Sequence, residues 1–460
     1  MRNALDRYFI DQLEVASMFI NVDAVHDSPA LPEQVDVVVI GGGIVGTTAA
    51  YELARQGVSV ALLEKGLIGG EQSSRNWGWV RQQNRDMFEL PLAMYSLERW
   101  EAFSTEIGRD VGFRRNGIVY TTDSPESLAK WEAWGQQARE QGFISHMLSA
   151  DEARGRAPGT TSSCIGGVWS PNDAQAEPSM ACSAIATGAR EQGAYIHQNC
   201  AVRGLDLHEG RVSGVWTEHG LIKTSTVICA GGAWSSRFCR RHGVELPSAN
   251  IMGTALQTTA APEVTPGCLI TPKVALRRRL DGSYTLALPG LGRVEISPQG
   301  LRYARKFYAA YRSKLAKKLQ IRIGASFFNG PEAAGSWQFD QVSPFERQRV
   351  LDPTPDLPQA RAALAALQAE YPALQGVHIA RAWAGMIDTT PDMIPIISPV
   401  DAIPGFIVAA GFSGHGFGIG PGAGRLAADL ATNSSPVVNP LPYHIKRFSD
   451  GSRIRQPEMM

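Results

Sequence analysis

The feature that most constrains this fold is a glycine-rich turn between two apolar runs near the N-terminus. The β-branched run Val35–Ile40 leads into a G-x-G-x-x-G at 41–46, and apolar residues at helical spacing follow. A second run, Val58–Leu63, ends on Glu64. This order of strand, glycine turn, helix and strand is typical of a βαβ unit that binds a dinucleotide. We therefore predict an α/β fold whose first domain is Rossmann-like.

Each part of this unit has a physical role. Gly41 permits the tight turn, Gly43 lets the backbone approach a pyrophosphate, and Gly46 lets the helix pack on the strand. The helix N-terminus adds N–H donors and a partial positive charge. Glu64 would accept the ribose hydroxyls, which favours FAD or NAD over NADP. The alternative is a purely structural glycine turn, which the flanking strand, helix and acid make the weaker interpretation.

The length, charge and cysteine content of the chain limit the class of protein. A chain of 460 residues favours two domains. Lys+Arg 44 balances Asp+Glu 44, so no overall charge attracts nucleic acid. The six cysteines form no C-x-x-C, so we expect neither a metal site nor an iron–sulfur cluster. Without a signal peptide or an apolar run of about 18 residues, a cytoplasmic protein is the expectation.

Two further glycine-rich stretches suggest a longer cofactor. Residues 65–79 combine glycines, small hydroxyls and two tryptophans, which suits hydrogen-bond donors placed beside a flat ring such as a flavin, although a well-packed loop would look similar. Strand Phe406–Ala410 precedes glycines at 411–420, and we expect a helix from Pro421 or Gly422 to Leu430. A second backbone cradle implies a cofactor longer than a mononucleotide.

A basic stretch at 301–322 has apolar residues at steps of three and four, which predicts an amphipathic helix. Such a helix could contact anionic lipid on the inner membrane face or an acidic partner subunit. It could equally cover its own core, which we favour. Residues 1–34 form a predicted N-terminal arm that packs on its own domain or on a partner.

We expect an interleaved domain organisation. The FAD-binding domain is discontinuous and a substrate domain, built on an antiparallel sheet, is inserted into it. The predicted segments are 35–82, 166–246 and 382–436 for the FAD-binding domain, 83–165 and 247–381 for the substrate domain, and 437–460 for a C-terminal tail.

These motifs resemble those of the FAD-dependent amine and amino acid oxidoreductases of the D-amino acid oxidase type, the group of glycine oxidase and sarcosine oxidase. The resemblance runs from Val35 to Leu430, through the fingerprint, 230–234, Thr390-Pro391-Asp392 and 410–417. The phrases at 70–75, 343–346 and 395–398 look most like those of membrane-associated L-amino acid deaminases.

The resemblance implies a set of cofactor-binding residues. Gly385 stands where sarcosine oxidases attach flavin through cysteine, so we expect non-covalent FAD. The implied residues are Gly41, Gly43, Ile44, Val45, Gly46, Glu64, Lys65, Ser73, Ser74, Arg75, Asn76, Val202, Ala230, Gly231, Trp234, Gly385, Gly411, Gly414, His415, Gly416, Phe417 and Gly418.

The resemblance also implies the oxidation of an amino acid or N-substituted amino acid to an imine, which hydrolyses to a keto acid and ammonia or amine. Trp79, Arg293 and Tyr303 are candidates for the substrate pocket, with Arg293 holding a carboxylate. No catalytic base is assigned, although His415 could serve. The oxygen-activating lysine of the oxidases is not identifiable, which favours a quinone or protein over O2 as electron acceptor. The alternatives are a 2-hydroxy acid dehydrogenase and the flavin subunit of an opine-type or RNA-modifying complex.

Overall fold

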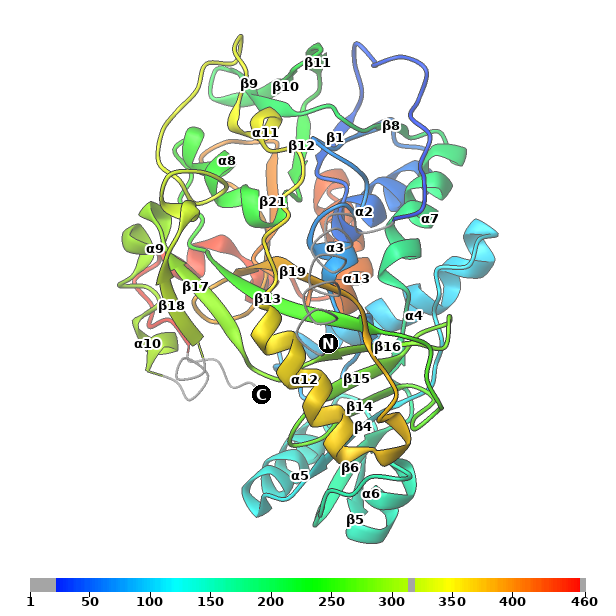
Figure 1. Ribbon diagram of the computed structural model, residues 1–460. Coiled ribbons are helices and arrows are strands. Elements are labelled where there is room, and N and C mark those ends of the chain that lie inside the picture. The colour runs from blue at the N-terminus through cyan, green and yellow to red at the C-terminus, as the bar shows by residue number, and fades with distance from the viewer. Residues whose placement is uncertain (1–21, 313–318, 456–460) are drawn as a thin grey trace, which may run out of the picture.

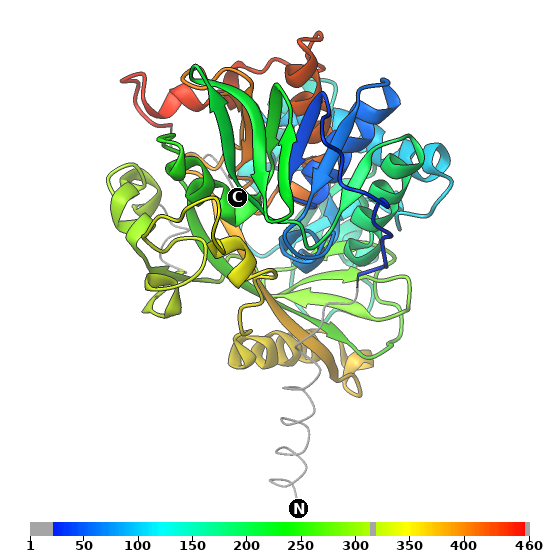
Figure 2. The same ribbon diagram turned by 90° about the horizontal axis from the view of Figure 1, so that it is seen from above.

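The computed structural model describes residues 22–312 and 319–455, which form two large sheets with helices packed around them (Figures 1 and 2). A three-stranded sheet and a two-stranded sheet, β3 Trp79–Val80 with β7 Ala174–Gln175, complete the strands. The six-stranded sheet has the order β20-β21-β12-β1-β2-β8, and all its strands are parallel except β20. The predicted strands Val35–Ile40 and Val58–Leu63 are confirmed within two residues at their ends, and Phe406–Ala410 is confirmed with the predicted bounds. The bounds in this sheet are β1 Val37–Ile40, β2 Val60–Leu63, β8 Tyr195–His197, β12 Thr226–Cys229, β20 Ile396–Pro399 and β21 Phe406–Ala410.

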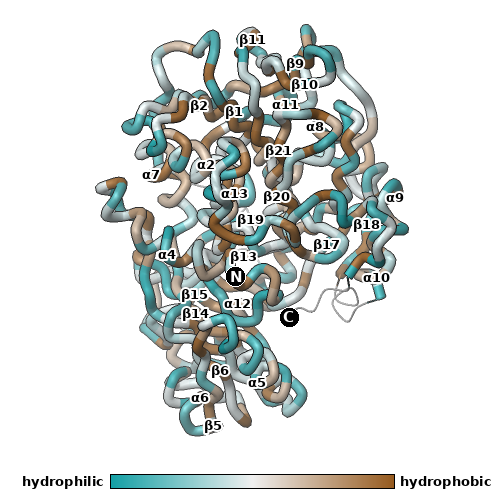
Figure 3. Tube along the Cα trace, turned by 180° about the vertical axis from the view of Figure 1, so that it is seen from behind, coloured by the Kyte–Doolittle hydropathy of each residue, from teal (hydrophilic) through white to brown (hydrophobic). Residues whose placement is uncertain are grey.

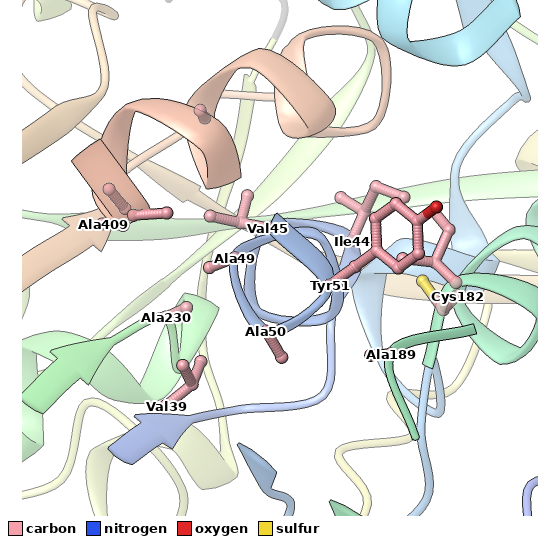
Figure 4. Close-up of a cluster of buried hydrophobic side chains, with 14 of the residues drawn as sticks. Val39, Ile44, Val45, Ala49, Ala50, Tyr51, Cys182, Ala189, Ala230 and Ala409 are labelled. Carbon is pink, nitrogen blue, oxygen red and sulfur yellow. The ribbon is translucent and has the colours of Figure 1, made fainter. Parts of the chain in front are cut away.

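The apolar character of β1 follows from burial on both of its faces. Val37 and Val39 pack in a core with four helices, whereas Val38 packs in a second core with α8 and the three-stranded sheet β9–β11. Figure 3 shows the hydrophobic residues of β1 and β21 in the interior, and Figure 4 shows α2 surrounded by small and apolar side chains, including Val39 and Ala230. The bounds are α2 Ile44–Arg55, α4 Leu90–Ile107, α7 Pro178–Glu191, α13 Gly416–Thr432, α8 Ser235–Arg241, β9 Val202–His208, β10 Arg211–Thr217 and β11 Gly220–Lys223.

The second sheet has ten strands in the order β18-β17-β13-β16-β15-β14-β4-β6-β5, with β19 paired on β13. It is mostly antiparallel, as predicted, but β14 with β4 and β17 with β18 are parallel pairs. Helix α12, Leu357–Glu370, packs on it. The strands are β4 Ile118–Thr122, β5 His146–Ser149, β6 Gly166–Ser170, β13 Ala249–Thr258, β14 Cys268–Ile270, β15 Ala275–Arg278, β16 Tyr284–Ala287, β17 Gly292–Ile296, β18 Leu319–Ile323 and β19 Ile379–Thr389.

The interleaving of the two sheets differs in detail from the expected boundaries. Strand β6 pairs with β4 in the larger sheet, although 166 was the predicted return to the FAD-binding domain. Strand β19 also belongs to the larger sheet and runs through the predicted boundary at 382. Residues 166–170 and 379–389 therefore both belong to the larger sheet.

The predicted helix over 301–322 is wrong. The chain forms two short helices, α9 Pro298–Tyr303 and α10 Tyr308–Tyr311, and then β18, which pairs with β17 as an edge strand. The helical spacing behind the prediction ends at Leu319, whereas Leu319, Ile321 and Ile323 alternate with polar residues as a strand does. Lys314, Leu315, Lys317 and Lys318 lie outside the described residues, as does most of the predicted arm 1–34.

The last predicted loop is also shorter than expected, because α13 begins at Gly416 and includes the glycines that follow. A Cβ at Gly424 would lie 2.6 Å from the Val45 carbonyl oxygen, and one at Gly420 would lie 2.6 Å from Ile44 Cγ2. These glycines let α13 approach α2 closely. Within the described residues, no helix combines the length and apolarity needed to cross a bilayer.

Candidate functional site

A cavity opens where β1, β12 and β21 end and the two sheets meet. It contains about 1320 Å³ of space free of protein atoms, including the part open to solvent. Its walls come from segments far apart in the sequence: the β1–α2 turn, the segment 63–76, the β12–α8 region, the loop at 345–351, the end of β19, and the start of α13. The carboxyl ends of parallel strands are where open α/β sheets bind ligands.

At one end of the cavity, the β1–α2 turn has the predicted geometry. Gly41 has φ +106°, and its missing Cβ leaves room for the Ala230 carbonyl oxygen, which would lie 2.5 Å away. The amide of Ile44 donates to Ser73 Oγ at 2.9 Å, so the segment after β2 is attached to the start of α2. The first turn of α2 thus presents backbone N–H groups to the cavity.

Glu64 lies beside this turn and is fixed by the backbone. Its Oε2 accepts from the Gly42 amide and its Oε1 from the Gly66 amide, both at 2.7 Å. Burial raises the pKa of Glu64, and Lys65 and these two amides oppose the rise. Each oxygen retains a lone pair for a further donor, such as a ribose hydroxyl.

Lys65 and Trp234 close this end of the cavity. The Lys65 ammonium pairs with Glu71, donates to the carbonyl oxygens of Gln348 and Arg349, and lies 4.7 Å from the centre of the Trp234 ring. The indole of Trp234 donates to Glu71 Oε1 at 3.3 Å. These contacts join the loop at 348–349 to the cavity wall.

At the other end, the start of α13 faces the cavity through Gly414, Gly416 and Phe417. The turn before it is held by Asp388, whose Oδ2 accepts from the Gly411 amide at 2.6 Å. Two helix N-termini, those of α2 and α13, therefore face the same cavity. Each carries N–H donors and a partial positive charge suited to an electron-rich or anionic group.

The glycines of the cavity test whether an extended cofactor fits. A Cβ at Gly231 would have Ser235 Oγ as its nearest neighbour at 3.4 Å, and one at Gly414 would have Ile387 Cγ2 at 3.7 Å. Gly231 is therefore not explained by crowding from protein atoms, in contrast to Gly46, whose Cβ would lie 1.9 Å from the Gly41 oxygen. Gly414 is not crowded either, but its φ of +84° itself favours glycine. Bare backbone at both ends of one cavity fits a cofactor as long as FAD.

Many of the sequence-predicted cofactor residues lie in the cavity wall. They are Gly41, Gly43, Ile44, Val45, Glu64, Lys65, Ser73, Asn76, Val202, Ala230, Gly231, Trp234, Gly414, Gly416 and Phe417.

The remaining predicted cofactor residues lie behind the wall. Ser74 Oγ donates to the carbonyl oxygen of Glu71 at 3.1 Å, and the carbonyl oxygen of Gly418 accepts from Trp100 Nε1. Arg75 pairs with Asp352 and donates to the Ala384 oxygen. Gly46 packs against the Gly41 carbonyl oxygen, and the amide of Gly411 donates to Asp388, so both contact protein rather than the cavity.

Gly385 is explained by a side chain rather than by the cavity. A Cβ there would lie 2.1 Å from Gln72 Oε1 and 3.0 Å from Arg75 Cβ. A cysteine at this position would therefore require Gln72 to move. Non-covalent binding of FAD stays a prediction, which follows from the glycine at this position.

His415 is buried behind the start of α13 rather than in the cavity wall. Its Nδ1 lies 3.1 Å from Glu89 Oε2 at the start of α4, and its Nε2 has no partner within the described structure. Burial, followed by the nearby Arg85, lowers the pKa of His415 to about 4. The ring is neutral at pH 7 and joins α13 to α4.

The three substrate-pocket candidates are not brought together. Trp79 stacks on Tyr120 with ring centres 6.4 Å apart. Arg293 pairs with Glu295 at 3.3 Å. In the sheet, Arg293 on β17 is opposite Met252 on β13, and Met252 is in turn opposite the cavity residue Met386 on β19. Arg293 is thus two strands from the cavity. Tyr303 is buried in α9 beside Phe307.

Several wall residues were missed by the sequence analysis. Phe345 in the short helix α11, Pro344–Arg347, and Leu351 in the loop after it have no local cofactor signal. Met386 and Asp388 come from β19, a strand that the sequence analysis did not predict. Asp388 had a detectable signal, a carboxylate in an apolar strand just before Thr390-Pro391-Asp392. The other missed wall residues include Glu71, Gln72, Cys229, Phe238, Ala409 and Phe412.

The fold and cavity define a flavin-type dinucleotide enzyme, and comparison with known proteins agrees. The family model described as FAD dependent oxidoreductase matches residues 36–430. The chain belongs to this family, and FAD is its cofactor.

Individual relatives cover most of the chain. The structure of L-amino acid deaminase from Proteus myxofaciens in complex with anthranilate has a TM-score of 0.89 and 30% identity, covering 94% of this chain and 97% of that one. Sarcosine oxidase subunit beta of Arthrobacter sp is 26% identical over 442 residues, 93% of this chain and 94% of the relative. Mouse mitochondrial sarcosine dehydrogenase is 26% identical, but the match spans only 42% of its length.

Proposed function

We propose that this oxidoreductase oxidises the CH–NH bond of an amino acid or an N-substituted amino acid. The observation that carries the proposal is a cavity with a helix N-terminus at each end, in a chain that matches an L-amino acid deaminase structure over 94% of its length. Bound FAD supplies an acceptor for the two electrons and the hydrogen of the substrate Cα–H bond. The substrate amine loses a proton, a C=N bond forms, and the imine hydrolyses to a keto acid and ammonia or amine.

The contribution of the protein to this chemistry is positioning. In our proposal, Glu64 holds the ribose, the α2 N-terminus the pyrophosphate, and the α13 N-terminus the ring edge that gains negative charge on reduction. Arg293 is paired with Glu295 two strands from the cavity and Trp79 is stacked on Tyr120, so we assign neither of them to the substrate in this proposal. Holding the donor carbon against the cofactor in a dry pocket replaces a bimolecular encounter.

We further propose that a quinone or protein, rather than O2, accepts the electrons. Among the described residues of the cavity wall, Lys65 is the one lysine, and its ammonium is bound to Glu71 and two carbonyl oxygens near the Glu64 end. It is therefore poorly placed to activate oxygen at the α13 end. Turnover with a quinone analogue should exceed oxygen consumption, and the reverse ratio would contradict this proposal.

The substrate class is tested by anaerobic mixing of the FAD-loaded protein with D- and L-amino acids, N-alkyl amino acids and 2-hydroxy acids. Loss of the flavin absorbance with an amino or N-alkyl amino acid supports the proposal. Bleaching by 2-hydroxy acids alone would instead establish the hydroxy acid dehydrogenase. If dithionite bleaches the flavin but no substrate does, the flavin-subunit alternative, in an opine-type or RNA-modifying complex, gains support.

A second proposal concerns an exposed surface around the edge strand β18. Ile323 is 80% exposed, Phe328 75% and Ile321 68%, and Arg305, Lys306, Arg312 and Arg322 lie in the same segments. Exposed apolar side chains among cations favour a peripheral contact with an anionic membrane surface. The replacement of Ile321 and Ile323 by serine should weaken sedimentation with phosphatidylglycerol vesicles and leave flavin binding intact. Equal sedimentation would contradict the proposal, leaving contact with a partner subunit.

A further inference from the structure

One carboxyl group at the α13 end of the cavity has no role in the chemistry described above. Asp388 lies near the end of β19, and its side chain is 7% exposed. Its Oδ2 accepts from the Gly411 amide at 2.6 Å, and its carbonyl oxygen accepts from the Ser413 amide at 2.8 Å. The carboxyl group thus lies in the cavity wall and against the turn that leads into α13.

The strand beside Asp388 presents an unsatisfied amide. Asn250 on β13 is directly opposite Asp388 in the antiparallel register, so both side chains lie on one face of the sheet. Asn250 is 2% exposed, and neither its Oδ1 nor its Nδ2 has a partner within the described structure. A buried amide oxygen without a donor is costly. Protonated Asp388 would provide that donor, whereas the ionised carboxylate would not.

No cation in the cavity wall is available to pair with Asp388. The other charged residues of the described wall are Glu64, Lys65 and Glu71, and Lys65 is bound to Glu71. Glu332 Oε1 accepts from the backbone N–H of Asn250 at 2.8 Å. Four ionisable groups near the end of β19 that faces the cavity are engaged in pairs: Arg75 with Asp352, Arg293 with Glu295, Arg447 with Asp392, and His415 with Glu89. Arg381 lies on β19 itself and Arg361 on α12.

Burial therefore dominates the titration of Asp388. It raises the pKa of this carboxyl group to about 6, although the amides of Gly411 and Phe412 oppose the rise. Reduction of a flavin adds negative charge in the same water-poor cavity. A like charge nearby disfavours the ionised carboxylate further, so reduction should increase the proton affinity of Asp388.

We propose that Asp388 binds one proton from solvent when the bound FAD is reduced and releases it when the FAD is reoxidised. The carboxylate becomes a carboxylic acid, its O–H would be the donor that the Asn250 amide oxygen on the same face of the sheet lacks, and no substrate bond changes. Asp388 is thus a positioning residue that compensates the charge of the reduced cofactor. The inference rests on FAD binding and is independent of the substrate.

The test is the midpoint potential of bound FAD between about pH 5.5 and about pH 9. Each proton taken up with two electrons contributes about 30 mV per pH unit, since that is the tenfold equivalent of a two-electron couple. Above about pH 6, the wild-type potential should fall by about 30 mV per pH unit more than that of Asp388→Asn. Asn retains an acceptor for the Gly411 amide, and the exposed Asp340→Asn serves as control. Equal slopes in wild type and Asp388→Asn would overturn the proposal.

A second measurement covers the case in which Asp388→Asn binds FAD poorly. Redox difference infrared spectroscopy of the wild-type holoprotein should show the carbonyl band of a protonated carboxyl group appearing on reduction. Asn250→Ala should lower the pH at which the steep pH dependence of the midpoint potential ends, because protonated Asp388 loses its acceptor. The absence of a new carboxyl band in the wild type would overturn the proposal without any variant.

Discussion

At the residue scale, His242 illustrates how one hydrogen bond fixes a protonation state. Its Nε2 accepts from the Leu205 amide at 3.1 Å, and burial, followed by Arg241, lowers its pKa to about 4. Between pH 6.5 and about pH 4, His242 binds a proton in the unfolded chain but not in the folded one. The contribution of neutral His242 to the free energy of unfolding is therefore complete above pH 6.5 and is lost as the pH falls. We expect His242→Gln to reduce the loss of melting temperature from pH 7 to pH 4.5. The exposed His378→Gln should retain the wild-type pH dependence, and an unchanged slope in His242→Gln would contradict this account.

Glu64 is the residue through which, in our proposal, the cavity selects its nucleotide. Its carboxylate is held between two backbone amides, and replacement by Gln puts an NH2 donor against one of them. A hydrogen bond to a charged group contributes about 1.5–3 kcal/mol, so Glu64→Gln should weaken FAD binding by about tenfold or more. Titration calorimetry of the apoprotein measures this, with Glu101→Gln on α4 as the control. Equal affinity in Glu64→Gln would mean that Glu64 only shapes the turn.

At the element scale, the glycines of α13 act as a packing surface. A Cβ at Gly424 would lie 2.6 Å from the Val45 carbonyl oxygen and 2.7 Å from Thr48 Cβ, so Gly424→Ala must separate α13 from α2. Such overpacking costs about 1–3 kcal/mol. Gly155 in α6, Ala150–Arg156, has no neighbour within 4 Å, so Gly155→Ala should instead stabilise by about 0.5–1 kcal/mol. Denaturant unfolding of both variants checks the opposite signs, and two changes of the same sign would contradict this explanation.

The same elements mark the limit of the sequence-based prediction. The β1–α2 turn was predictable because its glycines, strand and acid are contiguous and each has a local physical reason. Glycines 416–420 were assigned to a loop because their low helix propensity is outweighed only by the contact of α13 with α2 and α4, which the sequence alone does not reveal. Phe345 and Leu351 reach the cavity through tertiary structure alone. The cavity-wall residues near β19 could therefore be identified only from the folded structure.

At the scale of the whole molecule, the cavity is a junction between segments that the sequence separates widely. Residues near 41–76, 229–238, 345–351 and 386–417 line it, and they come from both sheets. A ligand that binds only the folded state stabilises it by RT ln(1 + [L]/Kd), about 2.7 kcal/mol at 100 times Kd. FAD should therefore raise the melting temperature of the apoprotein in a concentration-dependent way. ADP, which reaches only the α2 end, should raise it less and should protect the segment 386–417 less against hydrogen exchange. If ADP protected 386–417 as strongly as FAD does, the two ends of the cavity would not be spanned by one cofactor, and the arrangement of two helix N-termini on a single ligand would be wrong.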